Sequence, residues 1–312
     1  ALNYTLRQPV GVVGCISPWN LPLYLLTWKI APALAAGNTV VAKPSEVTPM
    51  TAFLFSKICQ KADFPKGVIN IVHGYGHKVG DALSRHPDVP IISFTGGTAT
   101  GEKIAAVAAP MFKKLSLEMG GKNPNIIFEN ADFDNAVKMS AKAAFSNQGQ
   151  ICLCGSRLFV QESIYDKFRT AVIQETQTLK VGDPKDEKSN LGAVVSKPHM
   201  EKILNCIERS KEEGGEILTG GNRVILKGNL KDGYYIEPTI IDGLTANCKT
   251  NQEEIFGPVV SMIPFKSEEE VIEMANSTKY GLSASLFTKD VSRAHRVAAA
   301  IDSGIVWVNT WM

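Results

Sequence analysis

The chain has 312 residues, of which 44% are hydrophobic and 21% charged, and its formal net charge is +2 at pH 7. This composition is that of a globular protein, and the length suggests about two domains that can each bury a core. The balanced charge and the lack of any apolar run long enough to span a bilayer argue against nucleic acid and membrane as partners.

The first third of the chain alternates short apolar strands with helices. Strands are expected over residues 2–6, 10–16, 39–42, 68–72, 91–94 and 114–117. Helices are expected over 23–36, from Thr48-Pro49, where Thr48 is the expected cap, and after the Gly96 loop. This alternation is typical of a parallel, doubly wound sheet. Ligands bind such sheets at the carboxyl ends of the strands, where Pro18-Trp19-Asn20, Lys43 and Glu118 stand.

The rest of the chain repeats the alternation. Strands are expected over 125–128, 158–160, 217–218, 235–236, 259–263, 284–287 and 305–308, and helices over 132–146, 163–179, 197–213 and from Ser267, whose partner Glu270 completes a capping box. The double glycine Gly120-Gly121 marks the expected boundary between a Rossmann-like cofactor domain, 1–119, and a second α/β domain, 120–312. Because the chain opens at the expected strand 2–6 and stops shortly after 305–308, which is read as a buried strand, we expect a chain truncated at both ends.

Two stretches in the first domain suit a dinucleotide. Gly96-Gly97-Thr98-Ala99-Thr100-Gly101 follows a strand and opens a helix, as a pyrophosphate site requires, although its G-x-T-x-x-G pattern departs from G-x-G-x-x-G and also fits an ordinary glycine turn. Lys43 and Glu46 follow a strand and suit a ribose as donor and acceptor, or form a solvated loop pair. A carboxylate at this place would repel a 2′-phosphate, which favours NAD over NADP.

Three further motifs suit carbonyl chemistry. Cys152 lies on a polar, glycine-interrupted loop between a helix and a strand, and Glu118 ends a strand before the double glycine, so one offers a nucleophile and the other a base. We expect their segments to meet. Asn20 suits an oxyanion donor together with the backbone N–H of Cys152. Taken singly, each has a plainer interpretation: a core thiol, a solvated carboxylate and a turn amide.

The cysteines and histidines give no metal pattern. The six cysteines are scattered, and the close pair Cys152 and Cys154 has neither a second pair nor a histidine at zinc spacing. We expect no metal site, five structural or exposed histidines and a reducing, cytoplasmic compartment.

In combination, these motifs resemble the aldehyde dehydrogenase superfamily over essentially the whole chain. The matching pieces, in order, are Pro18-Trp19-Asn20, Lys43-Pro44-Ser45-Glu46, Phe94-Thr95-Gly96-Gly97-Thr98, Leu117-Glu118-Met119-Gly120-Gly121-Lys122-Asn123-Pro124, Asn147-Gln148-Gly149-Gln150-Ile151-Cys152 and Glu254-Ile255-Phe256-Gly257-Pro258. The Cys152 segment is most similar to the aminomuconate- and hydroxymuconate-semialdehyde dehydrogenase branch.

The resemblance implies a role for each matching residue. Cys152 is the implied nucleophile, Glu118 the general base, Asn20 the oxyanion amide and Lys29 a lysine near that base, while Cys154 is expected to pack. The implied cofactor-binding residues are Ile16, Pro18, Trp19, Lys43, Ser45, Glu46, Gly76, Gly80, Thr95, Gly96, Gly97, Glu254 and Phe256. Gly97 stands where many members have Ser, so one side-chain contact to the pyrophosphate is expected to be missing.

The implied reaction is NAD-dependent oxidation of an aldehyde to a carboxylic acid through a cysteine thiohemiacetal and thioester, and the implied aldehyde is a semialdehyde. Two alternatives stay open: acyl transfer to coenzyme A or phosphate, against which Glu118 argues, and a non-catalytic dinucleotide-binding fragment. The resemblance also implies a homo-dimer or homo-tetramer in the full-length protein, with a small aldehyde as substrate.

Overall fold

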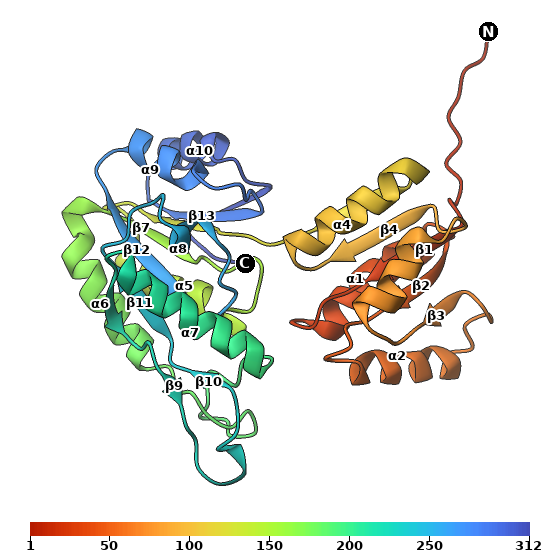
Figure 1. The fold of residues 1–312 in the computed structure, drawn as a ribbon. Helices are drawn as coiled ribbons and strands as arrows, with labels where there is room; N and C mark the ends of the chain where they lie inside the picture. The colour runs from red at the N-terminus through yellow and green to blue at the C-terminus, as the bar shows by residue number, and fades with distance from the viewer. The chain divides into compact units, whose positions relative to one another are not determined.

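The computed structural model describes all 312 residues, which form two compact units, Ala1–Met119 and Gly120–Met312. Each unit has its own main sheet and its own core, and Figure 1 shows the elements of both. No helix in the structure has both the length and the apolar character needed to cross a membrane.

The first unit is built on five parallel strands in the order β3-β2-β1-β4-β5. The strands are β1 (Val12–Ile16), β2 (Thr39–Lys43), β3 (Ile69–Ile71), β4 (Ile91–Thr95) and β5 (Lys114–Glu118); the helices are α1 (Pro22–Ala35), α2 (Met50–Lys61), α3 (Asp81–Arg85) and α4 (Thr98–Ala108), with helical turns η1 (Gly76–Gly80) and η2 (Ala109–Met111). The predicted parallel, doubly wound sheet is confirmed. Its order reverses at β1, the switch point beside which such sheets bind ligands.

Strand residues of the first unit alternate between two helical layers. Val13 and Val40 pack with α1 and α2, whereas Ile92 and Phe94 pack with side chains of α3 and α4 on the other face. Burial on both faces explains why these strands are apolar throughout rather than alternating. Gly37, with φ of 78°, follows α1 in the left-handed conformation that ends many helices.

The second unit contains a seven-stranded sheet in the order β14-β13-β6-β7-β12-β11-β8 and a separate pair, β9 and β10. All neighbours in the large sheet are parallel except β8, which runs antiparallel to β11. The strands are β6 (Pro124–Ile127), β7 (Arg157–Gln161), β8 (Glu216–Thr219), β9 (Arg223–Val224), β10 (Tyr235–Ile236), β11 (Thr239–Asp242), β12 (Val259–Phe265), β13 (Ser283–Phe287) and β14 (Ile305–Val308). The helices are α5 (Phe133–Phe145), α6 (Tyr165–Gln177), α7 (Lys197–Glu212), α8 (Lys249–Gln252), α9 (Glu268–Asn276) and α10 (Val291–Ala300), with turns η3 (Ser146–Gly149), η4 (Glu162–Ile164) and η5 (Gly228–Leu230).

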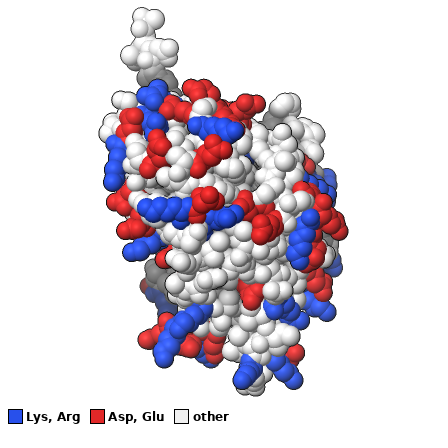
Figure 2. All heavy atoms as spheres, turned by 90° about the vertical axis from the view of Figure 1, so that its left-hand side faces the viewer, with Lys and Arg blue, Asp and Glu red and all other residues white.

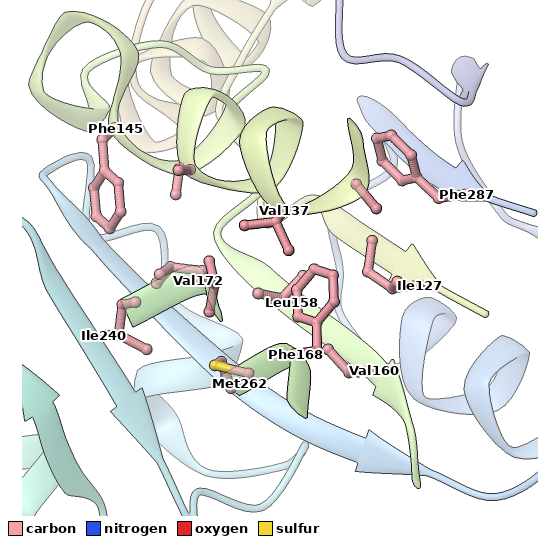
Figure 3. Close-up of a cluster of buried hydrophobic side chains, with 14 of the residues drawn as sticks. Ile127, Val137, Phe145, Leu158, Val160, Phe168, Val172, Ile240, Met262 and Phe287 are labelled. Atoms are coloured by element: carbon pink, nitrogen blue, oxygen red, sulfur yellow. The ribbon is translucent and has the colours of Figure 1, made fainter. Parts of the chain in front are cut away.

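The large sheet is also covered on both faces. Figure 3 shows Val137 and Phe145 of α5 directed toward the strands, where Leu158 and Val160 of β7 meet them. Phe159, between the last two, belongs to the opposite layer with α9 and α10. This two-sided burial fixes the register of β7, because a slip of one residue would exchange its two apolar faces.

Charged side chains of both signs intermingle on the face turned to the viewer in Figure 2. Ion pairs within the second unit join Arg169 to Asp242 at 3.2 Å and Arg296 to Glu268 at 3.0 Å. This face therefore has no extended field of one sign that would attract a polyanion.

The structure corrects four sequence-based expectations. Residues 2–6 form no strand, because no other segment pairs with them and they lie exposed. The strand over 305–308 is not buried: β14 pairs with β13 alone, and Ile305 is 44% exposed. Thr48, expected as the cap of α2, makes no capping bond. Elements β9, β11, α8 and α10 were not predicted.

Candidate active site

The candidate cofactor residues of the first unit lie at the carboxyl ends of its strands. Lys43 ends β2 and is 3% exposed, and its ammonium bonds the Glu46 carboxylate at 2.8 Å. The second oxygen of Glu46 accepts a 3.4 Å bond from the backbone N–H of Gly76. Burial acts to raise the pKa of Glu46, but the bonds from Lys43 and Gly76 hold it below its ordinary value. The pair thus presents a charged donor and acceptor side by side.

A cavity of about 350 Å³ opens in the first unit. Gly76 and Gly80 form part of its wall, and Ile16 and Phe94 supply apolar surface. Its remaining walls come from η1, α3 and α4, through His77, Asp81, Ser84, Thr100, Lys103, Ile104 and Val107. A mostly apolar slot with a few polar groups suits a flat heterocycle such as adenine. Because the aliphatic stem of Lys43 lies near Gly80, the slot and the ion pair adjoin.

The glycine loop after β4 leads into the N-terminus of α4. Gly97 is the N-cap residue with no side-chain cap, and a Cβ built on it would meet nothing within 4 Å. Gly96 is anchored instead, because its N–H donates to the backbone oxygen of Glu118 at 3.0 Å. An open helix N-terminus offers free N–H groups and positive potential to a phosphate. Thr95 lies buried just before it, and the buried Ser45 hydroxyl accepts from the Val47 N–H at 3.3 Å.

Lys29 and Glu118 belong to one electrostatic neighbourhood in the first unit. Lys29 is 6% exposed, and its ammonium bonds the Ser93 hydroxyl at 3.3 Å. Burial lowers the pKa of Lys29, and the negative charge of Glu118 opposes this shift. Burial likewise raises the pKa of Cys15 to about 11, so that thiol stays neutral. Glu118 lies exposed at the end of β5, and Pro18, Trp19 and Asn20 are half-buried after β1.

In the second unit, Cys152 lies on a loop, residues 147–156, that we call the nucleophile loop. Asn147 and Gln148 adopt left-handed conformations with φ of 50° and 57°, and Gly149 follows at 68°. Three such residues in succession are costly outside glycine and persist where surrounding structure fixes them. Cys152 is partly exposed, whereas Cys154 is buried with its pKa raised to about 12, mainly by burial.

The segment around Glu254 packs against the nucleophile loop. A Cβ on Gly149 would lie 2.0 Å from the Gly257 oxygen, so the two backbones touch. Glu254 accepts from the Gly121 N–H at 2.9 Å, and burial raises its pKa. Phe256 has φ of 61°, and its backbone oxygen lies 2.7 Å from His199 Nε2 on α7. The plain structural reading of His199 therefore holds.

Arg157 ties the start of β7 to two other elements. Its fully buried guanidinium donates to the carbonyl oxygens of Lys122, at 2.8 Å, and of Met274 and Ala275, at 2.8 and 2.6 Å, in the last turn of α9. No carboxylate takes part, so the carbonyl dipoles at the C-terminus of α9 stabilise the cation.

The candidate residues of the two units lie at opposite ends of their parallel strands. In the second unit the double-glycine segment, the nucleophile loop and the Glu254 segment precede β6, β7 and β12, which run parallel. They consequently gather at the amino ends of the strands, unlike the candidate residues of the first unit. The structure thus assembles two groups: the cofactor candidates with Lys29, Glu118 and Asn20 in one unit, and Cys152, Glu254 and Phe256 in the other.

Comparison with known proteins assigns the family. The model of the aldehyde dehydrogenase family matches residues 1–312. The chain belongs to the aldehyde dehydrogenase family. Among its curated relatives in this family, 2-aminomuconic semialdehyde dehydrogenase from Mus musculus is 53% identical and 2-hydroxymuconic semialdehyde dehydrogenase from Pseudomonas sp. (strain CF600) is 46% identical, each match covering 100% of this chain and 64% of the relative.

The fold of an aldehyde dehydrogenase is also found by structural comparison. Betaine aldehyde dehydrogenase from Staphylococcus aureus, solved in complex with NAD⁺, superposes with a TM-score of 0.95 at 44% identity, over 97% of this chain and 60% of that one. The chain therefore spans somewhat under two thirds of the length of these aldehyde dehydrogenases.

Some residues that shape the site were not singled out from the sequence. Asn123 falls inside a quoted motif, but nothing in the sequence shows what its amide contacts. Ser93, His199 and Trp311 each contact a predicted site residue or its loop, and they come from distant parts of the chain. Their positions became apparent only once the strands were placed side by side.

Proposed function

We propose that this chain carries the cofactor-binding and nucleophile-bearing units of an NAD-dependent aldehyde dehydrogenase that oxidises a semialdehyde to a carboxylic acid. The observation that carries the proposal is the nucleophile loop, which presents Cys152 from a framework of the family's own motifs. The names of the relatives support a semialdehyde as substrate.

The first unit fits NAD. Its apolar cavity suits adenine, the adjoining Lys43 and Glu46 suit the ribose hydroxyls, and the open N-terminus of α4 at Gly97 suits the pyrophosphate. The carboxylate of Glu46 disfavours a 2′-phosphate. When bound, NAD would supply the hydride acceptor that takes the adduct on Cys152 from thiohemiacetal to thioester.

The chain's own residues would carry the other steps. The Cys152 thiolate attacks the aldehyde carbon and forms an S–C bond, while the Asn20 amide and a backbone N–H donate to the new oxyanion. Glu118 then accepts a proton from water, whose oxygen attacks the thioester and releases the acid and the thiolate. Only two residues, Met119 and Gly120, separate Glu118 from Gly121 in the chain. The Cys152 carbonyl oxygen lies beside the Cα of Gly121, and this short tether supports a joint role.

Two measurements test the proposal. Aldehyde-dependent NADH formation, supplied with 2-hydroxymuconate semialdehyde as probe, is expected for the chain and should vanish in Cys152→Ser. Glu118→Gln should release one equivalent of NADH quickly and then stall with a thioester on Cys152, visible by intact-mass spectrometry. No NADH in any form of the protein, or a requirement for coenzyme A, would contradict water as the acceptor and this function.

A cytoplasmic location and a homo-dimer or homo-tetramer belong to the same proposal. Exposed apolar side chains in the first unit support assembly: Phe112 is 94% exposed and Ile58 on α2 is 61% exposed. Light scattering at two concentrations would test it, and a strictly monomeric full-length protein would contradict it.

A further inference from the structure

Three successive carbonyl groups of the nucleophile loop are held by side chains from outside it. The carboxamide of Asn123 donates to the oxygens of Cys152 at 2.7 Å and of Cys154 at 2.8 Å. The indole N–H of Trp311 donates to the oxygen of Leu153, between them, at 2.8 Å. Loop carbonyls usually face water, so three in a row bonded by two nearly buried side chains form an unusual clamp.

Both N–H donors of the Asn123 carboxamide are used in holding the loop. Besides its two donated bonds, its side-chain oxygen accepts from the Ser283 N–H at 3.2 Å, and its backbone oxygen accepts from the Arg157 N–H at 3.2 Å. The residue is 3% exposed. A buried amide whose donors are both used fixes the atoms that it contacts, because releasing either leaves an unpaired polar group.

Gly121 shows how closely this segment follows the loop. A Cβ at that position would lie 2.5 Å from the Cys152 carbonyl oxygen, so only glycine allows the approach. Trp311 packs in a small cluster with Ile151 and Cys154. The close backbone contact at Gly121 and the packed indole together leave the peptide groups after Cys152 little freedom to rotate.

We propose that Asn123 and Trp311 are positioning residues that set the orientation of the Cys152 thiol. The inference rests on the proposed function, in which Cys152 is the nucleophile. Fixing the carbonyl of Cys152 fixes the peptide plane that follows its Cα, and fixing the next two carbonyls prevents the loop from rotating as a unit. A displacement of about 1 Å in a reacting group can cost on the order of 10²-fold in rate, so a loosened clamp should slow reactions at Cys152.

The test compares Asn123→Asp with Asn125→Asp. Both replace a nearly buried β6-segment amide by an isosteric carboxylate, but Asn125 bonds Ser140 and Ser285 and no atom of the nucleophile loop. The readout is the rate of iodoacetamide labelling at Cys152 relative to that at Cys248, by peptide mass spectrometry, in samples shown to be folded by circular dichroism. We expect this ratio to fall at least about tenfold in Asn123→Asp and to stay within twofold of wild type in Asn125→Asp.

Trp311→Phe provides a second variant, which keeps an aromatic ring at this position and removes the N–H donor. We expect a smaller fall in the labelling ratio and, with NAD and aldehyde, a lower kcat per folded molecule with an unchanged KM for NAD. A ratio unchanged or raised in both clamp variants, or an equal fall in Asn125→Asp, would overturn the clamp. If wild-type Cys152 itself labels no faster than Cys248, the assignment of the nucleophile fails instead.

Discussion

Gly149→Ala tests whether the nucleophile loop depends on its contact with Gly257. The new Cβ would lie 2.0 Å from the Gly257 oxygen and 2.4 Å from its carbon, both backbone atoms that no side-chain rotation can move. Restoring an ordinary contact of 3.4 Å requires a shift of about 1.4 Å. We expect the free energy of unfolding to fall by about 1 kcal/mol for an alanine in the left-handed conformation and by about 1–3 kcal/mol more for the overlap. We also expect slower labelling of Cys152 by iodoacetamide.

The matched control for this change is Gly228→Ala. Gly228 has φ of 63°, close to the 68° of Gly149, but a Cβ there meets nothing within 4 Å. Gly228→Ala should lower the free energy of unfolding by only about 1 kcal/mol and leave the labelling of Cys152 unchanged. Urea unfolding followed by tryptophan fluorescence gives the free energies of unfolding. Equal losses in the two variants, with equal labelling, would refute the close contact.

Three further changes probe the cofactor cradle and the buried cations. A serine side chain at Gly97 would meet no obstruction and would place a hydroxyl at the N-terminus of α4. Isothermal titration calorimetry of Gly97→Ser should therefore show NAD binding about fivefold tighter. Unchanged or weaker binding would contradict a pyrophosphate site at this helix end. Burial lowers the pKa of Lys122 to about 7 in the folded protein, against about 10.4 in the unfolded chain. Between these two pH values the unfolded chain binds more protons than the folded protein, so the free energy of unfolding rises with pH. Lys122→Met should remove that part of the slope between pH 7 and 10 in urea titrations, and identical slopes would show that the amine titrates normally. Arg157→Met should lower the free energy of unfolding by about 3–5 kcal/mol, because three carbonyl oxygens lose their donor. Arg223→Met, at an exposed site, should lower it by less than about 0.5 kcal/mol. Similar losses in the two variants would contradict the role assigned to Arg157.

The sequence predicts the sheets well because their strands are buried on both faces. Short apolar runs such as β1, β4 and β7 stand out between polar loops, and the strict alternation with helices allows few topologies. β11 was missed although it is fully buried, because Thr239–Asp242 is short and follows β10 after only two residues. Residues 2–6 have strand-like composition but no partner, and partnership is a tertiary property that local pattern does not contain.

The residues of the candidate site also fall into two groups, those that local sequence identifies and those that only the fold identifies. Residues with distinctive chemistry in quoted motifs, such as Cys152 and Lys43, are found from the sequence, and the pairing of Lys43 with Glu46 follows from their spacing. The residues that hold the site in place are not. Asn123 and Trp311 are 188 positions apart, and only the assembled sheet shows that both bond the same loop.

The amino-end location of the nucleophile loop leaves the opposite rim of the same sheet available for protein engineering. Loops there follow β6, β7, β12 and β13, and each exposes a charged residue: Glu129, Glu162, Lys266 and Lys289. The length of the strands separates these loops from Cys152. A fluorescent reporter or an immobilisation tag inserted beside Lys266 would therefore lie a strand's length from the Cys152 thiol, which makes this rim an attachment point for a surface-bound sensor.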